Sequence, residues 1–438
     1  MPDSTEKPSH WHPIMTKYLL ILLCIATPAF AQLGHEIEDI EVRGNEKTRI
    51  EIIHQVLPVK IGQTLNKGDL DRSRQVLERL QFFRTVFVNV KPGSEKGKAI
   101  LVVYVQEKRF GDLGVSLEYS ELDGFGIATD AYYANLRGEG KLIGVEYGLG
   151  ERLKYWGFRY SDPLFLKTNQ AFHIQITGSS ADRDIFRNSN PDVRGRYDLK
   201  RIGFSLGVGQ PSPHRAYHLV LKYAFEAVQT GAFQRPIIPT GDELFANEIA
   251  AAEGRENLSK LTLQLIKQSA ITLWGSVQGT DFNAGLTLSS KALGSVANFI
   301  RLRTELYRHQ QLFPGHILSF GGKAGATCGT PPFYERFYID GPNQLRGIER
   351  RVIGPEGGTQ FFTAEAIYAI DLKTLGRAYV FAESGGVRRT IGNTQRNDAD
   401  AAFGIGFLLF NRVDISFGIS TGTLIVKSHR FGGIKLGL

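Results

Sequence analysis

Two short stretches of this chain have the spacing of a hydrolase nucleophile. "GFSLG" at 203–207 and "GISTG" at 418–422 both match G-x-S-x-G, in which the serine attacks an acyl carbon. That chemistry needs a sharp turn from a strand into a helix, which exposes the serine to its base. Both stretches lie instead in runs of alternating apolar residues, and no helix is predicted after either of them. The sequence therefore predicts no serine hydrolase and no other enzyme.

Signatures of metal and cofactor binding are also missing from the sequence. His10 and His12 precede a secretory signal, and the remaining histidines do not have the spacing of metal ligands. No phosphate-binding loop or dinucleotide fingerprint stands between a predicted strand and a predicted helix. We expect neither a metal site nor a cofactor.

One arginine-bearing stretch interrupts an otherwise regular β pattern. "FYIDGPNQLRGIERR", residues 337–351, begins with apolar residues, turns at 340–343 and then continues into Arg346 and Gly347. A guanidinium offers a planar fork of donors that matches carboxylates. Arg350 and Arg351 are interpreted as solvated loop charge. The role of Arg346 depends on the elements that surround it.

The first 31 residues are interpreted as an N-terminal extension and a signal peptide. Residues 15–31, "MTKYLLILLCIATPAFA", have Lys17, an apolar core and small residues before the cleavage point at Ala31. Residues 1–14 do not resemble the first region of a signal, so Met15 is a candidate for the true start. The sequence predicts export from the cytoplasm.

The charge pattern argues against a nucleic-acid partner. The 438-residue chain has a formal net charge of +8, but its basic residues are scattered, without a cationic helix or zinc-finger spacing. No apolar run of about 18 residues follows the signal, so no transmembrane helix is predicted. An exported chain can still enter a membrane if its strands form a barrel.

Residues 36–108 predict a small α+β domain in the order strand, helix, helix, strand, strand. A strand around Ile40 precedes a capping box at 48–51, which is expected to open the first helix. Asp69 is expected to cap the second helix. Two alternating segments, the second at 100–105, complete the unit. About 70 residues suffice for a core of this size.

The remaining residues, 110–438, predict an all-β membrane domain. In residues 143–149, 217–225, 300–306 and 413–419 one face is apolar, and charges and glycines recur on the other. Lipid outside and a polar lumen inside require such alternation. At roughly 20 residues for each strand and its connection, the segment predicts a transmembrane barrel of about 16 antiparallel strands.

Several motifs carry a family resemblance. "IEVRGNEKT" and "LERLQFFRTVFVNV", within 36–108, resemble a polypeptide-transport-associated (POTRA) domain. "FYIDGPNQLRGI", "GGTQFFTAEAIYAI" and "AYVFAESGGV" resemble, in this order, a lumenal loop and the two strands after it. The chain thus resembles the outer-membrane assembly superfamily of BamA, TamA and Sam-type proteins, with one POTRA domain and a bacterial surface antigen barrel. Glu383-Ser384-Gly385 stands where the family usually shows Asp-Ala-Gly.

The resemblance implies a latch in the barrel lumen. It places residues 328–356 in a loop that folds back inside, where Arg346 meets Glu365 and Glu383 on neighbouring strands. A charge in a partly dry cavity needs a partner, and Gly347 lets the backbone pass close to the wall. The alternative is that each of these charges only lines a pore.

The resemblance also implies a function and a location. The barrel would lie in the outer membrane bilayer and residues 36–108 in the periplasm. The expected function is insertion and folding of unfolded β-barrel clients, with periplasmic chaperones or accessory lipoproteins as further partners. The alternatives are a polypeptide exporter of the two-partner secretion type and a passive porin. Gly433, Leu436 and Leu438 have the spacing of a C-terminal β-signal, although they also suit an ordinary last strand.

Overall fold

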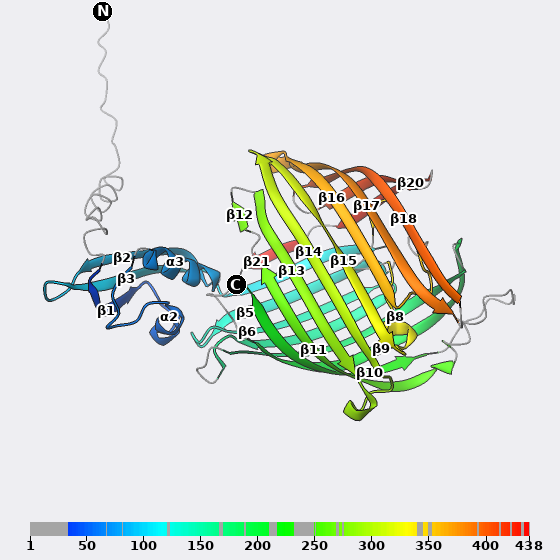
Figure 1. Cartoon of the computed structure of the whole chain (residues 1–438), viewed down its shortest axis with the longest axis horizontal. Helices are drawn as coiled ribbons and strands as arrows, with labels where there is room; N and C mark the ends of the chain where they lie inside the picture. Colours follow the sequence, from blue (N-terminus) through cyan, green and yellow to red (C-terminus); the bar gives the residue numbers. More distant parts are fainter. Residues whose placement is uncertain are drawn as a thin grey trace, which may run out of the picture. The chain divides into compact units, whose positions relative to one another are not determined.

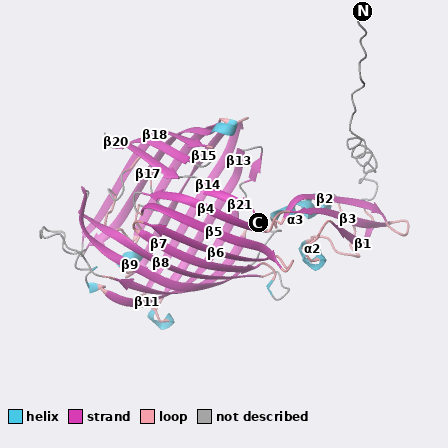
Figure 2. Cartoon of the chain, turned by 180° about the vertical axis from the view of Figure 1, so that it is seen from behind, coloured by secondary structure: helices cyan, strands magenta, loops and turns pink. Residues whose placement is uncertain are grey.

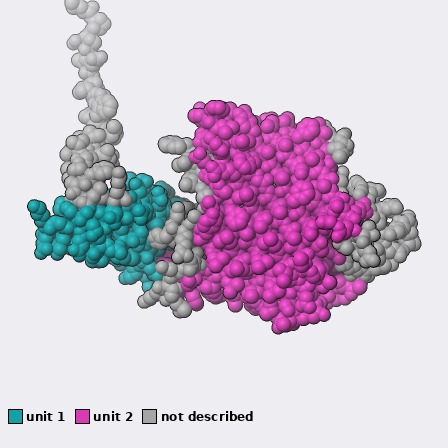
Figure 3. All heavy atoms as spheres, viewed as in Figure 1, with its two compact units in different colours: residues 1–108 teal, residues 109–438 magenta. Residues whose placement is uncertain are grey.

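A computed structural model describes most of the chain after its first 33 residues. The described residues are 34–66, 68–80, 82–120, 123–165, 170–187, 190–209, 217–231, 249, 251–268, 271–273, 276–339, 345–348, 353–391, 394–410, 413–420, 423–430 and 433–437. The extension and signal at 1–31, with Met15, and the terminal Leu438 lie outside them. The chain divides into two compact units, Met1–Lys108 and Arg109–Leu438 (Figure 3).

The first unit is a three-stranded sheet with two helices. Its elements are β1 (Glu36–Arg43), α2 (Ile50–Val56), α3 (Asp69–Arg79), β2 (Phe83–Pro92) and β3 (Lys98–Glu107). The strand order is β1-β3-β2, with β1 parallel and β2 antiparallel to the central β3. Ile53, Leu77 and Leu101, one each from α2, α3 and β3, are fully buried. The predicted order of strands and helices is confirmed.

Both helices begin differently from the prediction. Arg49 occupies the N-cap of α2 and makes no side-chain capping bond, so the capping box is wrong. The Glu107 carboxylate instead accepts hydrogen bonds from the backbone N–H groups of Lys47 and Thr48, at 3.0 and 2.7 Å. Gly68, with φ of 94°, is the N-cap of α3, and Asp69 is its first residue. A tertiary carboxylate thus binds the two N–H groups that precede the N-cap of α2, and a left-handed glycine is the N-cap of α3.

The second unit is one antiparallel sheet curled into a barrel (Figures 1 and 2). Its strands are β4 (Gly111–Ser120), β5 (Gly124–Leu136), β6 (Lys141–Gly150), β7 (Leu153–Asp162), β8 (Ala171–Arg187), β9 (Asn190–Gly209), β10 (His218–Thr230), β11 (Gly254–Gln268), β12 (Ile271–Leu273), β13 (Ser276–Ser289), β14 (Phe299–Phe313), β15 (His316–Gly329), β16 (Gln360–Asp371), β17 (Gly376–Ile391), β18 (Thr394–Leu409), β19 (Val413–Ser420), β20 (Thr423–Arg430) and β21 (Gly433–Gly437). Three short 3-10 helices, η3 (Lys291–Leu293), η4 (Phe333–Glu335) and η6 (Lys373–Leu375), lie in its connections.

Strand β12 continues β11, and strand β21 continues β20. β11 and β12 pair with β13 in one uninterrupted register, because Gln268 faces Asp281 and Ile271 faces Gln278. β20 is antiparallel to β19 and β21 is antiparallel to β4, so β20 and β21 run in the same direction as two parts of the last strand. In the described part of the chain, fifteen strands are thus followed by a divided sixteenth. The predicted fold class is confirmed.

Alternation along the strands separates an apolar outer face from a polar inner face. On β6, Val145 is 53% exposed while Gly144 and Glu146 point the other way, and on β14 Leu302 is 48% exposed. Arg301 and Arg303, adjacent to Leu302, face the interior. The apolar outer face explains how a chain with many exposed leucines and phenylalanines is stable in lipid.

Candidate functional site

The loop between β15 and β16 folds against the inner wall of the barrel. Backbone hydrogen bonds of 2.9 Å in both directions join Phe337 to Gly358 and tie the two ends of the loop together. Apolar side chains of the loop then pack on inward-facing residues of three strands, β16, β17 and β18. This buried cluster consists of Phe337, Ile339, Leu345, Ile348 and Ile353 from the loop and Phe361, Val387 and Ala402 from the wall.

Arg346 lies between two carboxylates and two aromatic rings. Its Nη1 is 2.6 Å from Glu365 Oε2 on β16 and 3.7 Å from Glu383 Oε2 on β17. Its guanidinium carbon is 5.9 Å from the ring centroids of both Tyr379 and Phe381. Burial alone would lower the pKa of Arg346, but Glu365 raises it above the usual range, so the guanidinium stays charged.

A single nitrogen of the guanidinium, Nη1, faces both carboxylates, although the guanidinium offers a planar fork of donors. Charge and aromatic stacking therefore describe the Arg346 site better than bidentate recognition does.

Gly347 connects the loop backbone directly to the same strands. Its N–H donates to Glu383 Oε1 at 2.5 Å, and Glu383 is only 4% exposed. A Cβ at position 347 would lie 2.5 Å from the Cβ of Ala402 on β18. Glycine is thus required for the close approach of two surfaces, because no space remains for a side chain.

A second charged contact, which was not predicted from the sequence, holds the beginning of the loop. Glu335 in η4 is 6% exposed, and its carboxylate meets cations from three strands. Arg201 of β9 is 3.0 Å away, Arg301 of β14 is 2.9 Å away and Lys260 of β11 is 3.5 Å away. Burial would raise the pKa of Glu335, but Lys260, Arg201 and Arg301 together lower it to about 2.

The neighbours of Glu335 fix the same segment. Arg201 Nη2 donates to the Tyr334 carbonyl at 2.8 Å, and the Tyr334 hydroxyl donates to Glu256 on β11 at 2.7 Å. Phe333 is 1% exposed and packs at the centre of a separate apolar cluster. A third pair joins the end of the loop to the wall, since Arg389 Nη1 of β17 lies 2.6 Å from Glu356 Oε2.

The structure brings four of the seven predicted site residues together: Arg346, Gly347, Glu365 and Glu383. Gly433 and Leu436 lie elsewhere, on β21, opposite Ser116 and Leu113 of β4. Leu438, Arg350 and Arg351 lie outside the described residues. The signal that could have identified Glu335 was "PPFYERFY", a carboxylate between aromatic residues directly after a strand, together with inward arginines such as Arg301.

The two serines of the G-x-S-x-G matches lie within strands. Ser205 is in β9, paired with Ala224 and Gln175, and Ser420 ends β19 opposite Ala402. Among the described residues, no three His, Cys, Asp or Glu side chains gather as a metal site would require. No helix in the described ranges is long and apolar enough to cross a membrane.

Comparison with known families identifies the class of protein. A model described as "Omp85 superfamily domain" matches residues 135–434, and a POTRA model, "Surface antigen variable number repeat", matches residues 35–108. The chain belongs to the Omp85 superfamily. Its barrel lies in the outer membrane and its POTRA domain in the periplasm, as predicted.

Similar proteins are known by sequence and by structure. The "Outer membrane protein assembly factor BamA" of Nitratidesulfovibrio vulgaris is 24% identical over 326 residues, and that of Neisseria meningitidis is 22% identical over 337. The matches cover 73% of this chain but only 38% and 40% of those relatives. The fold resembles BamA from Haemophilus ducreyi lacking POTRA domains 1–3 (TM-score 0.63, 16% identity, 92% of this chain and 85% of that one) and CdiB from Escherichia coli (0.62, 13%, 92% and 75%).

Proposed function

We propose that this protein inserts and folds other β-barrel proteins in the outer membrane. The observation that carries the proposal is the short ladder between the first and last strands. In the part of the chain that the structure describes, β4 pairs with β5 at all ten of its positions and with β21 at the five from Asp112 to Ser116. Among the described residues, β17 and β18 by contrast pair from Gly376–Leu409 to Ile391–Thr394. A sheet edge that is weakly paired can template an incoming strand.

The periplasmic domain offers a second sheet edge to clients. β2 lies at one edge of its sheet, and Phe87 on that strand is 65% exposed. An extended client segment could add to β2 through main-chain hydrogen bonds and cover Phe87. Periplasmic chaperones or accessory lipoproteins would use the same edge. The domain at 36–108 would thus deliver clients and the domain at 110–438 would fold them.

Export of a polypeptide through the lumen is the second candidate function. The fold does not choose between the two, since its TM-score is 0.63 against BamA and 0.62 against CdiB. The docked loop argues for assembly, because it is fixed to the inner wall at Glu335, Arg346 and Glu356 and would have to leave before a chain could pass. A passive porin would need neither the loop contacts nor the periplasmic domain.

A reversible disulfide bond that joins β4 to β21, called the β4–β21 lock below, tests the proposal. Val115 and Ile434 face each other in register, so a cysteine at each position can form a disulfide across the two strands. The exposed Cys328 is first replaced by serine. The oxidised protein in proteoliposomes should no longer fold an unfolded model barrel, scored by heat-modifiable migration, and reductant should restore folding.

The matched control places the same lock between β14 and β15, at Leu302 and Ala326, which also face each other in register. This disulfide should leave client folding unchanged. If the β4–β21 lock leaves folding intact, the proposed assembly mechanism is wrong. Export of a secreted polypeptide that survives the β4–β21 lock would favour the second candidate.

A further inference from the structure

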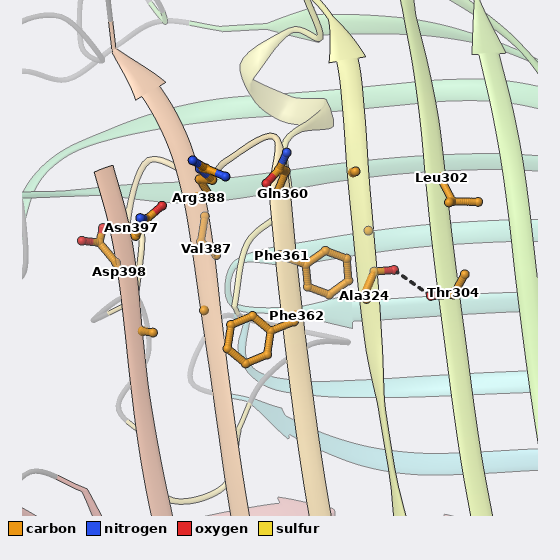
Figure 4. A pocket seen from close by; sticks show the side chains of 14 residues that line it. Leu302, Thr304, Ala324, Gln360, Phe361, Phe362, Val387, Arg388, Asn397 and Asp398 are labelled. Atoms are coloured by element: carbon orange, nitrogen blue, oxygen red, sulfur yellow. Dashed lines mark hydrogen bonds between the residues drawn. The ribbon is translucent and has the colours of Figure 1, made fainter. Parts of the chain in front are cut away.

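The outer face of strands β14–β18 contains a hollow of about 560 Å³ (Figure 4). Five of its lining residues form one continuous row, because each faces the next in the strand register. The row is Leu302, Ala326, Gln360, Arg388 and Asn397. It lies near the end of the barrel that carries the β15–β16 loop, since Gln360 is the first residue of β16.

Three neighbouring residues of this row make a cationic rim. Gln360, Arg388 and Asn397 are exposed, and all three carry N–H donors. Side chains that face each other on adjacent strands start about 5 Å apart. Arg388 donates one N–H to the Gln395 side chain on β18, so an anion on the rim would meet the remaining donors of Arg388 together with Gln360 and Asn397. The only carboxylate that lines the hollow, Asp398, occupies an inward position, 3.3 Å from Arg396. Among the described residues that line the hollow, the outward side of the rim therefore carries a positive charge and no carboxylate.

The floor of the hollow is apolar and made of small residues. The next row toward the middle of the barrel contains Ala324, Gly386 and Ala399, with Phe362 among them. Thr304 ends the row, and its hydroxyl bonds to the Ala324 carbonyl at 3.4 Å rather than entering the hollow. Rows are about 6.6 Å apart along the strands. Figure 4 shows Arg388 and Gln360 at one end of the hollow and Phe362 at the other.

We propose that this hollow binds an anionic phospholipid. The phosphate would accept hydrogen bonds from Arg388, Gln360 and Asn397, and an acyl chain would lie over Ala324 and Ala399. Charge complementarity selects this occupant, because the rim has a cation beside two amides and the surface below it is already apolar and faces lipid. A guanidinium is well suited to a phosphate because its donors are planar and rigid.

The site is independent of the proposed function, since it requires only that the barrel lies in the outer membrane. It also lies on the reverse side of the wall from the loop. Phe361, next to Phe362 on β16, points inward and stacks on Phe337 of the loop with ring centroids 4.5 Å apart. Lipid and loop would thus occupy opposite faces of the same strands.

Native mass spectrometry of the full chain in detergent tests the site. Phosphatidylglycerol and phosphatidylcholine with identical acyl chains are the probes. We expect the protein to retain one phosphatidylglycerol in preference to phosphatidylcholine, and R388Q to weaken that binding about tenfold. R308Q is the control, because Arg308 is an exposed arginine of β14 that bonds to Thr280, nearer the other end of the strand.

A second variant tests the acyl-chain part of the site. A324L combined with A399L fills the floor and leaves the rim intact, so it should weaken retention of both lipids. Heat-modifiable migration shows that each variant is folded. Equal retention by wild type and R388Q would overturn the proposal, as would displacement of the lipid by inorganic phosphate at the same concentration. Dimers that form through this face and are lost in R388Q would assign the hollow to a second copy instead.

Discussion

Glu365 of β16 and Glu383 of β17 face each other directly across the strand ladder. Two carboxylates in this relationship repel each other, and like charges directly opposite destabilise a sheet. Arg346 compensates this repulsion from the loop, with Nη1 2.6 Å from one carboxylate and 3.7 Å from the other. The wall therefore gains a stable charge distribution only when the loop is docked, which couples the position of the loop to the two strands.

Removal of Arg346 should release the middle of the loop without unfolding the barrel. Arg346→Ala leaves the Glu365–Glu383 pair without its cation, and breaking a buried pair costs about 3–5 kcal/mol, less where water enters. The strand ladders do not depend on the loop, so heat-modifiable migration should persist. Proteolysis near residue 346 should accelerate, and client folding should fall. Arg183→Gln is the control, because Arg183 of β8 is paired with Asp123 rather than with a residue of the loop or of its docking cluster.

A double-mutant cycle separates a latch from pore lining. Arg346→Gln with Glu365→Gln removes both charges and should be milder than the two single effects added together. Arg346→Lys should rescue only in part, because an ammonium keeps the charge but loses the planar contact with Tyr379 and Phe381. Strictly additive effects would mean that Arg346 only lines the pore.

Replacement of Gly347 should displace the loop by steric pressure alone. The new Cβ of Gly347→Ala would lie 2.5 Å from the Cβ of Ala402, and overpacking of this kind costs about 1–3 kcal/mol. Ala402→Gly removes the atom that clashes, so the double variant should regain protease resistance in the loop. A double variant as sensitive as Gly347→Ala would show that a different constraint acts on Gly347.

The alternation of apolar and polar residues was enough to predict the barrel, because side chains of a strand must point alternately to its two faces. It also placed Glu365 and Glu383 in the interior, and the loop motif supplied Arg346. Glu335 could not be found in this way. Its three cations come from strands far apart in the sequence, and only the curvature of the barrel brings Arg201 and Arg301 to one carboxylate.

Local capping rules failed for a related reason. The N–H groups before α2 are satisfied by Glu107, which arrives from the end of β3, about 60 residues later. Motifs within a few residues predict which elements form, and tertiary partners decide which atoms satisfy their ends.

Deletion of residues 36–108 should leave a folded barrel that handles clients poorly. The small unit has its own buried core, and the sheet of the second unit is complete from β4 onward. The truncated protein should migrate in a heat-modifiable way, and limited proteolysis of the full chain should leave a resistant core that starts near Phe110. Phe87→Ser, on the edge strand β2, should reproduce part of the client defect. If the truncated protein still folds clients fully, the domain at 36–108 has no part in client folding.

The Glu335 contacts should hold the start of the loop until the pH is strongly acidic. The folded pKa of Glu335, about 2, lies below its usual value of 4.5. The stabilisation is therefore complete above about pH 4.5 and is lost as the pH falls through the folded value. The difference corresponds to about 3 kcal/mol. Pepsin, which is active in acid, should cleave residues 333–338 only as the pH approaches 2–3.

Glu335→Gln should abolish this pH dependence and expose the segment even at neutral pH in a neutral-protease assay. It leaves Arg201, Lys260 and Arg301 around a site without an anion, and loss of one partner of a buried cluster typically costs about 3–5 kcal/mol. Glu305→Gln, in a lumen carboxylate paired with Arg303, is the matched control and should keep the wild-type profile. Release of the wild-type segment already near pH 4.5 would show that the three cations do not hold Glu335 ionised. A segment that stays protected at pH 2 would show that apolar packing around Phe333 fixes the loop instead.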